Sequence, residues 1–227
     1  IMAHELQHMM YFNQKGITGS TWIDEGLSVW AQQLVGEGFP QGRTTPVQQV
    51  GAYLKAPNTV SLNHWADNSL ANYGMSYLFV QYLFERCGQF SAIQKLERNT
   101  GPTGFNDINN VLVDATSTTQ LKPFLQDDFG LAMYCDGLDL PTALTGYVPA
   151  VHQFSGFQLR KGISGINGLS RISLNENPVT NQVFEMLGYG FDVVEYARGN
   201  GGDVEWTLVS SPSADFHVWV LYYQTDD

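Results

Sequence analysis

Cysteine is scarce in this chain, which has only Cys87 and Cys135 among its 227 residues. The two are far apart in sequence, so the Cys-x-x-Cys spacing of a thiolate metal site is absent. Both fall in segments that we predict to be helical. A single disulfide between these helices and two free buried thiols are both compatible with the sequence.

Basic residues are also few. The chain has 11 Lys and Arg against 22 Asp and Glu, which gives a net charge of -11 at pH 7. This balance argues against nucleic acid as a partner. No run of about twenty apolar residues is present, so we expect no membrane span. No secretory signal and no internal repeat are evident. The acidic, aromatic-rich composition fits an extracellular or cell-surface bacterial protein.

The most informative segment is His4-Glu5-Leu6-Gln7-His8, which has the pattern His-Glu-x-x-His. Residues four apart share one face of an α-helix, so His4 and His8 can bind one metal ion. Glu5 lies beside them and is suited to act as a general base on a water molecule. The alternative is a surface helix with two solvated histidines. Apolar neighbours predict a helix buried on most sides: Ile1, Met2, Met9, Met10, Tyr11 and Phe12.

A catalytic zinc site needs a third protein ligand. Glu25 is the candidate, because it lies at the start of a second apolar helix that begins near Thr21. The intervening segment 14–20 contains helix-breaking residues, so the two helices can pack antiparallel and bring Glu25 towards the histidines. The alternative for Glu25 is an ordinary carboxylate in the first turn of a helix.

The sequence HELQHMMYFNQK…WIDEGLSVWAQ resembles the gluzincin zinc metallopeptidases, the group of thermolysin and aminopeptidase N. It is most similar to hyicolysin-type secreted bacterial peptidases. The resemblance implies His4, His8 and Glu25 as Zn²⁺ ligands and Glu5 as the general base. It also implies a zincin fold, a protein or peptide substrate and hydrolysis of internal peptide bonds.

Two features depart from the family. The gap between His8 and Glu25 is shorter than in thermolysin. Thermolysin also has an aspartate, one helical turn after its ligand glutamate, that orients a zinc-binding histidine, and Val29 stands at that position here. Asp24 and Ser28 are the candidates for this orienting role, and the sequence does not choose between them.

A third apolar helix is predicted over 72–85, and Tyr73 lies in its first turn. In the aminopeptidase N group a tyrosine at the start of such a helix hydrogen-bonds the oxyanion, and the resemblance gives this role to Tyr73, with Tyr77 as the weaker candidate. His64 is a candidate second oxyanion donor or substrate contact. The alternative for the tyrosines is core packing, and for His64 an ordinary surface position.

The pattern of apolar residues changes near residue 148 and divides the chain into two predicted domains. Residues 1–147 predict a mostly helical catalytic subdomain, with further helices at 46–55, 91–98, 105–113 and 118–134. Residues 148–227 predict a small antiparallel β-sandwich, with alternating strands separated by turns. The fold class is therefore α+β. The predicted strands lie at 154–160, 182–186, 191–196, 204–209 and 216–223.

In gluzincins a β-sheet precedes the His-Glu-x-x-His helix, and its edge strand binds the substrate backbone. Nothing in this sequence can supply that sheet. We therefore expect the chain to be the C-terminal part of a longer protein, whose N-terminal part is a partner of the site. Two other functions stay open: an aminopeptidase-like zinc hydrolase, and a non-catalytic surface-binding protein on a relic of the fold. The intact motif argues against the relic.

Overall fold

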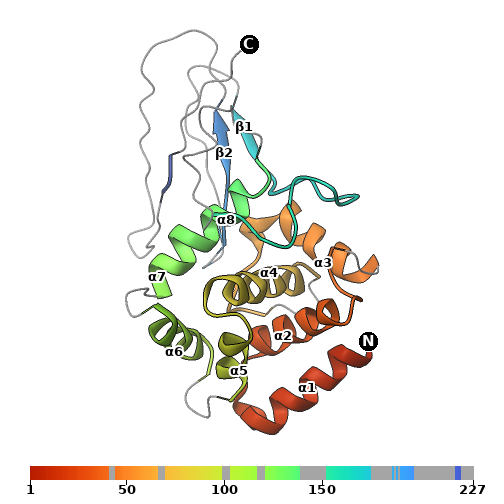
Figure 1. Cartoon of the computed structure of the whole chain (residues 1–227). Coiled ribbons are helices and arrows are strands. Elements are labelled where there is room, and N and C mark those ends of the chain that lie inside the picture. The colour runs from red at the N-terminus through yellow and green to blue at the C-terminus, as the bar shows by residue number, and fades with distance from the viewer. Residues whose placement is uncertain are drawn as a thin grey trace.

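The computed structural model describes residues 1–40, 44–65, 70–98, 103–116, 121–138, 152–174, 186, 188, 190–196 and 218–220. This part of the chain is mostly helical, as predicted for residues 1–147 (Figure 1). Its elements in chain order are α1 (Met2–Lys15), η1 (Gly16–Thr18), α2 (Thr21–Leu34), α3 (Thr44–Lys55), η2 (Pro57–Thr59), α4 (Leu70–Arg86), α5 (Phe90–Arg98), α6 (Phe105–Thr116), α7 (Leu121–Pro123), the π-helical segment η3 (Phe124–Phe129), α8 (Gly130–Cys135), β1 (Ile172–Leu174) and β2 (Val194–Tyr196).

Helix α4 is the centre of the helical part. Helices α2 and α3 pack directly against it, and α1 packs against α2 (Figure 1). Apolar residues occur on every side of α4, as expected of a helix that is covered all round. Its fully buried side chains include Tyr77, Leu78 and Phe79. The core therefore surrounds the helix that also carries Tyr73.

Two glycines allow the helices to approach α4 closely. A β-carbon on Gly26 of α2 would lie 2.8 Å from the backbone oxygen of Ser76 in α4. A β-carbon on Gly74 of α4 would collide with the backbone oxygen of Gln49 in α3. Any larger residue would force these backbones apart, because core atoms are already close-packed. Gly26 directly follows Glu25, so this contact also determines where Glu25 lies along α4.

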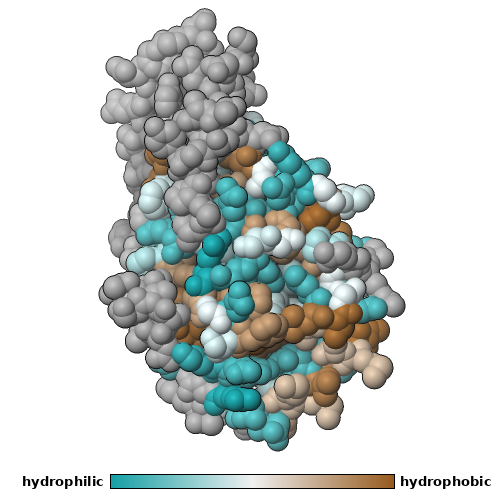
Figure 2. Space-filling view, in the orientation of Figure 1, coloured by the Kyte–Doolittle hydropathy of each residue, from teal (hydrophilic) through white to brown (hydrophobic). Residues whose placement is uncertain are grey.

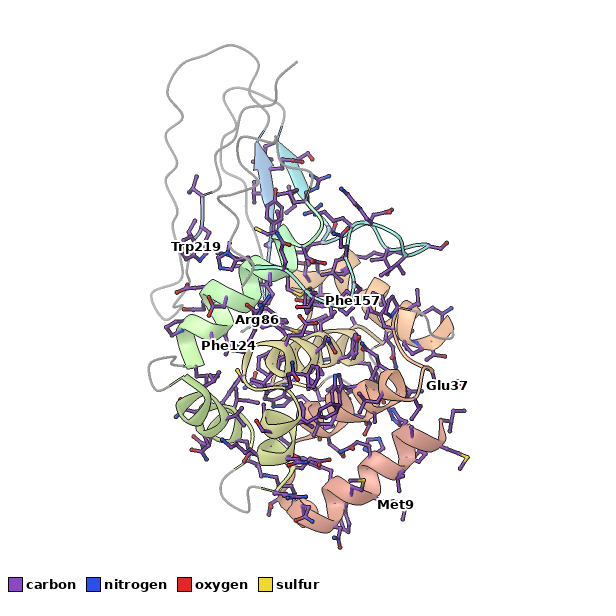
Figure 3. All side chains as sticks on the ribbon, in the orientation of Figure 1. Met9, Glu37, Arg86, Phe124, Phe157 and Trp219 are labelled. Atoms are coloured by element: carbon purple, nitrogen blue, oxygen red, sulfur yellow. The ribbon has the colours of Figure 1, made fainter. Side chains whose placement is uncertain are left out.

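The prediction that the first helix is buried on most sides is wrong. Only Tyr11 and Lys15 are buried in α1. Helix α1 is the outermost helix and packs through one face, on α2 and α5 (Figures 1 and 3). Hydrophobic residues are accordingly visible on the surface over α1 (Figure 2). The large apolar side chains exposed on this helix are Met2, Leu6, Met9, Met10 and Phe12.

A buried ion pair joins the C-terminal end of α1 to α6. Lys15 Nζ lies 3.0 Å from Asp107 Oδ1, and both side chains are almost completely buried. Burial raises the pKa of Asp107, and the hydrogen bond from Lys15 opposes that rise. Breaking a buried pair by removing one partner costs about 3–5 kcal/mol, because an uncompensated charge stays behind. The pair therefore fixes the end of α1 from which the chain turns into α2.

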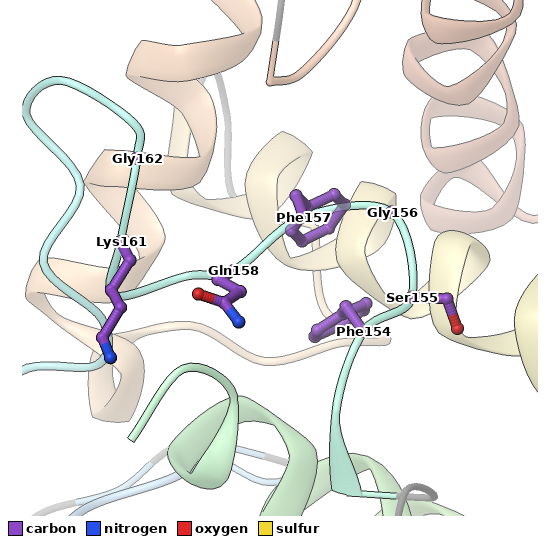
Figure 4. A pocket seen from close by; sticks show the side chains of 7 residues that line it. All are labelled: Phe154, Ser155, Gly156, Phe157, Gln158, Lys161 and Gly162. Atoms are coloured by element: carbon purple, nitrogen blue, oxygen red, sulfur yellow. The ribbon is translucent and has the colours of Figure 1, made fainter. Parts of the chain in front are cut away.

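The predicted strand at 154–160 is wrong, because this segment is a loop with one isolated bridge between Gln158 and Lys161. Its backbone amides bind a carboxylate instead of a neighbouring strand. Asp136 Oδ1 accepts from Phe154 N at 3.0 Å and Asp136 Oδ2 accepts from Leu159 N at 2.5 Å. The loop lines an open pocket of about 330 Å³ that includes none of the candidate site residues (Figure 4).

The aromatic residues of this loop belong to the helical core. Phe154 and Phe157 stack with ring centroids 4.9 Å apart. Phe157 packs edge-on against Phe39, and Phe154 packs against Tyr82 of α4. Their spacing of three residues suits this loop, whereas a strand would send them to opposite faces.

A relay of hydrogen bonds connects α2 to the same loop through α4. Trp30 Nε1 donates to Gln81 Oε1 at 2.9 Å, and Gln81 Nε2 donates to Glu85 Oε1 at 2.6 Å. Glu85 Oε2 then accepts from the backbone N–H of Ser155 at 2.8 Å. Each polar group in the relay has a partner, which removes the cost of burying it.

The two described strands do not match an antiparallel sandwich. Strands β1 and β2 pair in parallel, with Ile172 opposite Val194 and Leu174 opposite Tyr196. Strand β2 falls inside the predicted strand at 191–196, whereas β1 is not predicted. No β-sandwich is present in the described ranges. Most residues of the predicted strands at 182–186, 204–209 and 216–223 lie outside the described residues.

The described helices include none that is long and apolar enough to cross a membrane. Both cysteines are buried and free, so the alternative of two free thiols holds. Burial raises the pKa of Cys87 to about 12 and that of Cys135 to about 11. Neither thiol therefore has the thiolate character that makes a cysteine reactive at neutral pH.

Asp136 makes a testable contribution to pH-dependent stability. Burial raises its pKa to about 6 despite the two backbone hydrogen bonds. The unfolded value is about 3.9, so the folded state binds more protons between these values and the unfolding free energy falls as pH rises through this window. Urea unfolding of wild type and Asp136→Asn between about pH 4 and pH 7 should show that wild type loses up to about 3 kcal/mol relative to the variant. Parallel pH profiles for the two proteins would contradict this assignment.

Candidate metal centre

The pairing of α1 with α2 builds the candidate site. The short η1 segment reverses the chain, so the two helices run antiparallel, side by side (Figure 1). His4 and His8 lie one turn apart on α1 and face α2, and Glu25 lies near the start of α2. The side chains of all three are partly buried in the seam between the helices.

The three predicted ligands meet at one point. His4 Nε2 and His8 Nε2 are 3.0 Å apart. Glu25 Oε2 lies 3.5 Å from His4 Nε2 and 3.4 Å from His8 Nε2. Among the described residues, this is the group of three His, Cys, Asp or Glu side chains that could hold a metal ion.

The triangle of donor atoms has the dimensions of a zinc site. Zinc binds His nitrogen and carboxylate oxygen at about 2.0–2.2 Å with tetrahedral geometry, which places neighbouring ligand atoms about 3.3–3.5 Å apart. The three observed separations lie close to this spacing. Two imidazoles and one carboxylate leave a fourth tetrahedral position for water or substrate, as in catalytic zinc sites. The donor set and its dimensions therefore fit zinc.

The charges in the seam support a cation at this point. Hydrogen bonds to Asp24 and Glu25 raise the pKa of His8 to about 10. Burial alone would raise the pKa of Glu25, but hydrogen bonds from His4 and His8 lower it to about 2. The carboxylates thus hold positive charge on the imidazole when only protons are present. A divalent metal can take the place of those protons, since His and Glu ligands bind metal in their deprotonated forms.

His8 has two further partners, both on α2. His8 Nδ1 lies 2.9 Å from Asp24 Oδ1 and 3.1 Å from Ser28 Oγ. Both candidates that the sequence left open for an orienting role therefore contact the same nitrogen. Val29, which stands where thermolysin has its orienting aspartate, is a fully buried apolar residue. By contrast, His4 Nδ1 is buried without a hydrogen-bond partner in the described part of the chain.

Tyr73 lies next to the candidate metal position. Burial raises its pKa, and the charge of Glu25, the hydrogen bond to Glu25 and the charge of Glu5 raise it further. The phenol therefore stays protonated at neutral pH and is available as a hydrogen-bond donor. Trp65 packs edge-on against the Tyr73 ring, with centroids 4.9 Å apart. Tyr77, the weaker candidate, is fully buried and hydrogen-bonds Gln33, so its role is packing.

Glu5 and His64 have exposed side chains. Glu5 lies on α1 between the two histidines, close enough for its charge to influence Tyr73. The backbone of His64 is held to the start of α4, because Asn72 Nδ2 donates to His64 O at 3.2 Å. Within the described part of the chain, no contact joins the His64 imidazole to His4, His8 or Glu25, so this candidate is not brought into the cluster.

Trp65 is the site neighbour that sequence analysis missed. It follows His64 directly, and its partner Tyr73 is separated from it by a segment with no regular pattern. An aromatic residue beside a candidate histidine was the available signal, but a packing contact across that gap has no sequence signature.

No protein-family model matches the chain, and a search of curated proteins finds no match. The family resemblance therefore rests on the residues of the two site helices.

The geometry predicts one tightly bound zinc ion per chain. Elemental mass spectrometry of the purified protein should find about one zinc per molecule, because three preorganised ligands converge at tetrahedral spacing. His8→Ala removes one ligand and should lose the metal. The matched control is His152→Ala, which removes a histidine that lies 3.8 Å from Asp128, outside the cluster. Equal zinc content in all three proteins would contradict the site.

Proposed function

We propose that this protein is a zinc metallopeptidase of the gluzincin group that hydrolyses peptide bonds within protein or peptide substrates. The observation that carries the proposal is the convergence of His4 and His8 of α1 with Glu25 of α2 at close to tetrahedral spacing. Helix α1 also provides Glu5. Histidine pairs at this spacing with a third carboxylate ligand are typical of hydrolytic zinc sites, which keep one coordination position for chemistry.

The proposed roles follow from chemistry and position. His4, His8 and Glu25 would hold the zinc ion, which supplies Lewis acidity that activates water and polarises the scissile carbonyl. Glu5 accepts the proton of the attacking water and passes it to the leaving amine. Its exposed position on α1 leaves Glu5 accessible to both the attacking water and the leaving amine. Tyr73 donates a hydrogen bond to the oxyanion that develops on the carbonyl oxygen.

Electrostatics support this division of roles. Burial, followed by the charges of Glu25 and Glu5, raises the pKa of Tyr73, so the phenol keeps its proton while it donates. The strong interaction of Glu25 with both histidines keeps this carboxylate ionised, as a ligand must be. Glu5 has no such partner among the described residues, which suits a group that exchanges protons with substrate.

The exposed apolar side chains of α1 support a further part of the proposal. Contiguous apolar surface of this kind is typical of a face that another polypeptide covers. We propose that the N-terminal part of a longer chain covers it and supplies the substrate-binding wall.

We also propose an extracellular or bacterial cell-surface location. An aminopeptidase-like activity on the same site is separated from endopeptidase activity by comparing internally cleavable peptides with and without a blocked N-terminus.

Glu5→Gln should separate metal binding from turnover. The amide keeps the size of Glu5 but cannot accept the proton of water, so peptidase activity should fall by at least about 100-fold while zinc content stays at one per chain. The measurement is cleavage of a casein or quenched-peptide substrate, with zinc analysis of the same sample. Retention of full activity by Glu5→Gln would disprove the proposed mechanism.

Tyr73→Phe removes only the hydroxyl donor. Loss of one oxyanion donor typically costs about 100- to 1,000-fold in kcat, so we expect a decrease of that order with little change in KM or zinc content. Tyr77→Phe is the matched control, since its hydroxyl is buried away from the site. If the two variants had the same kcat, Tyr73 would have no role in the transition state.

A further inference from the structure

Two oxygen atoms of α2 contact the same ring nitrogen of His8. Asp24 Oδ1 lies 2.9 Å and Ser28 Oγ 3.1 Å from His8 Nδ1. Asp24 and Ser28 are four residues apart, so they lie on one face of α2 and approach the imidazole from adjacent turns. Asp24 and Ser28 therefore contact His8 at Nδ1, whereas the other ring nitrogen, Nε2, faces His4 and Glu25.

The chemistry of these partners favours one tautomer of His8. Asp24 Oδ1 lies 2.9 Å from Nδ1 in an ion-pair contact, and the negative charge of this carboxylate favours a proton on Nδ1. The neutral ring then has its lone pair on Nε2, the atom that lies 3.0 Å from His4 Nε2 and 3.4 Å from Glu25 Oε2. Ser28 Oγ, which is fully buried in α2, adds a second fixed contact that limits rotation of the ring.

We infer that Asp24 and Ser28 are positioning residues that fix His8 as a metal ligand, with Asp24 as the main contributor. This inference rests on the proposed zinc site. It assigns the orienting role to the residue directly before the ligand glutamate. Val29, one turn after Glu25, has no polar atom in its side chain and is fully buried, so it has no part in this task.

The two histidines are therefore held differently. His8 Nδ1 has an ion-pair contact with Asp24 and a hydrogen-bond contact with Ser28, whereas no such contact is seen for His4 Nδ1 in the described ranges. Carboxylate partners of metal-binding histidines typically change metal affinity by about 10- to 100-fold. The affinity of the site should consequently depend strongly on Asp24.

The test compares zinc affinities by chelator competition for wild type, Asp24→Ala, Asp24→Asn and Ser28→Ala. We expect the Asp24→Ala variant to bind zinc about 10- to 100-fold more weakly, and Asp24→Asn, which keeps an acceptor but loses the charge, to lie between it and wild type. Ser28→Ala should have the smallest effect. Glu37→Gln, which removes one negative charge three residues beyond the C-terminal end of α2, is the charge-matched control and should bind like wild type.

The visible absorption spectrum of the cobalt(II)-substituted proteins supplies a second readout, because it reports coordination geometry. A changed spectrum in Asp24→Ala, with a wild-type spectrum in Glu37→Gln, supports positioning of His8. Wild-type affinity and spectrum in both Asp24 variants overturn the inference while the zinc site stands. Failure of the wild-type protein itself to bind zinc overturns the proposed function and this inference together.

Discussion

The close packing of α2 against α4 is the constraint on which the candidate site depends. Gly26 has no side chain, and the backbone of α2 uses that space to approach Ser76 of α4. Glu25 is thereby placed beside the start of α4, where Tyr73 stands. Helix α1 then lies on α2 and adds the two histidines. The carboxylate of Glu25, the phenol of Tyr73 and the two imidazoles thus come together from three helices, because Gly26 leaves no β-carbon where α2 crosses α4.

The electrostatics of the seam follow from the same packing. The carboxylates of Asp24 and Glu25 lie against two imidazoles in a partly buried space. Such a space is costly for negative charge unless positive charge accompanies it. Protonation of His8, whose pKa is raised, supplies part of this positive charge. A single divalent cation could supply it instead. The seam therefore combines three potential metal ligands with carboxylate charge that a cation would neutralise.

The sequence was sufficient for the local parts of this site. On a helix, the spacing of His4 and His8 places both side chains on one face, and the turn before Thr21 brings Glu25 back to them. It was also sufficient to predict the helices that enclose the core. The prediction that α1 is buried on most sides was wrong. Apolar residues on several sides of a helix do not show which other elements pack against it.

The loop at 154–160 shows a second limit. Its alternating residues favour a strand, yet Asp136 binds the backbone amides that a strand would pair, and Phe154 and Phe157 both turn into the helical core. Such a competition between a side chain and a sheet ladder is not visible in a periodic pattern. The contacts of Asp24 and Ser28 with His8 were similarly open, since both residues were visible but the rotation of α2 about its axis was not.

The relay from Trp30 through Gln81 and Glu85 to Ser155 bears on how the protein can be divided. It joins the helix that carries Glu25 to a loop more than a hundred residues later in the sequence. That loop also contributes Phe154, Phe157 and Leu159 to the helical core. A fragment cut between α8 and this loop would expose aromatic surface and leave the carboxylates of Asp136 and Glu85 without their backbone donors. The loop is thus an integral part of the cooperative unit that carries the candidate metal centre, and a protease cleaving ahead of it would release a destabilised helical remnant instead of an independent module.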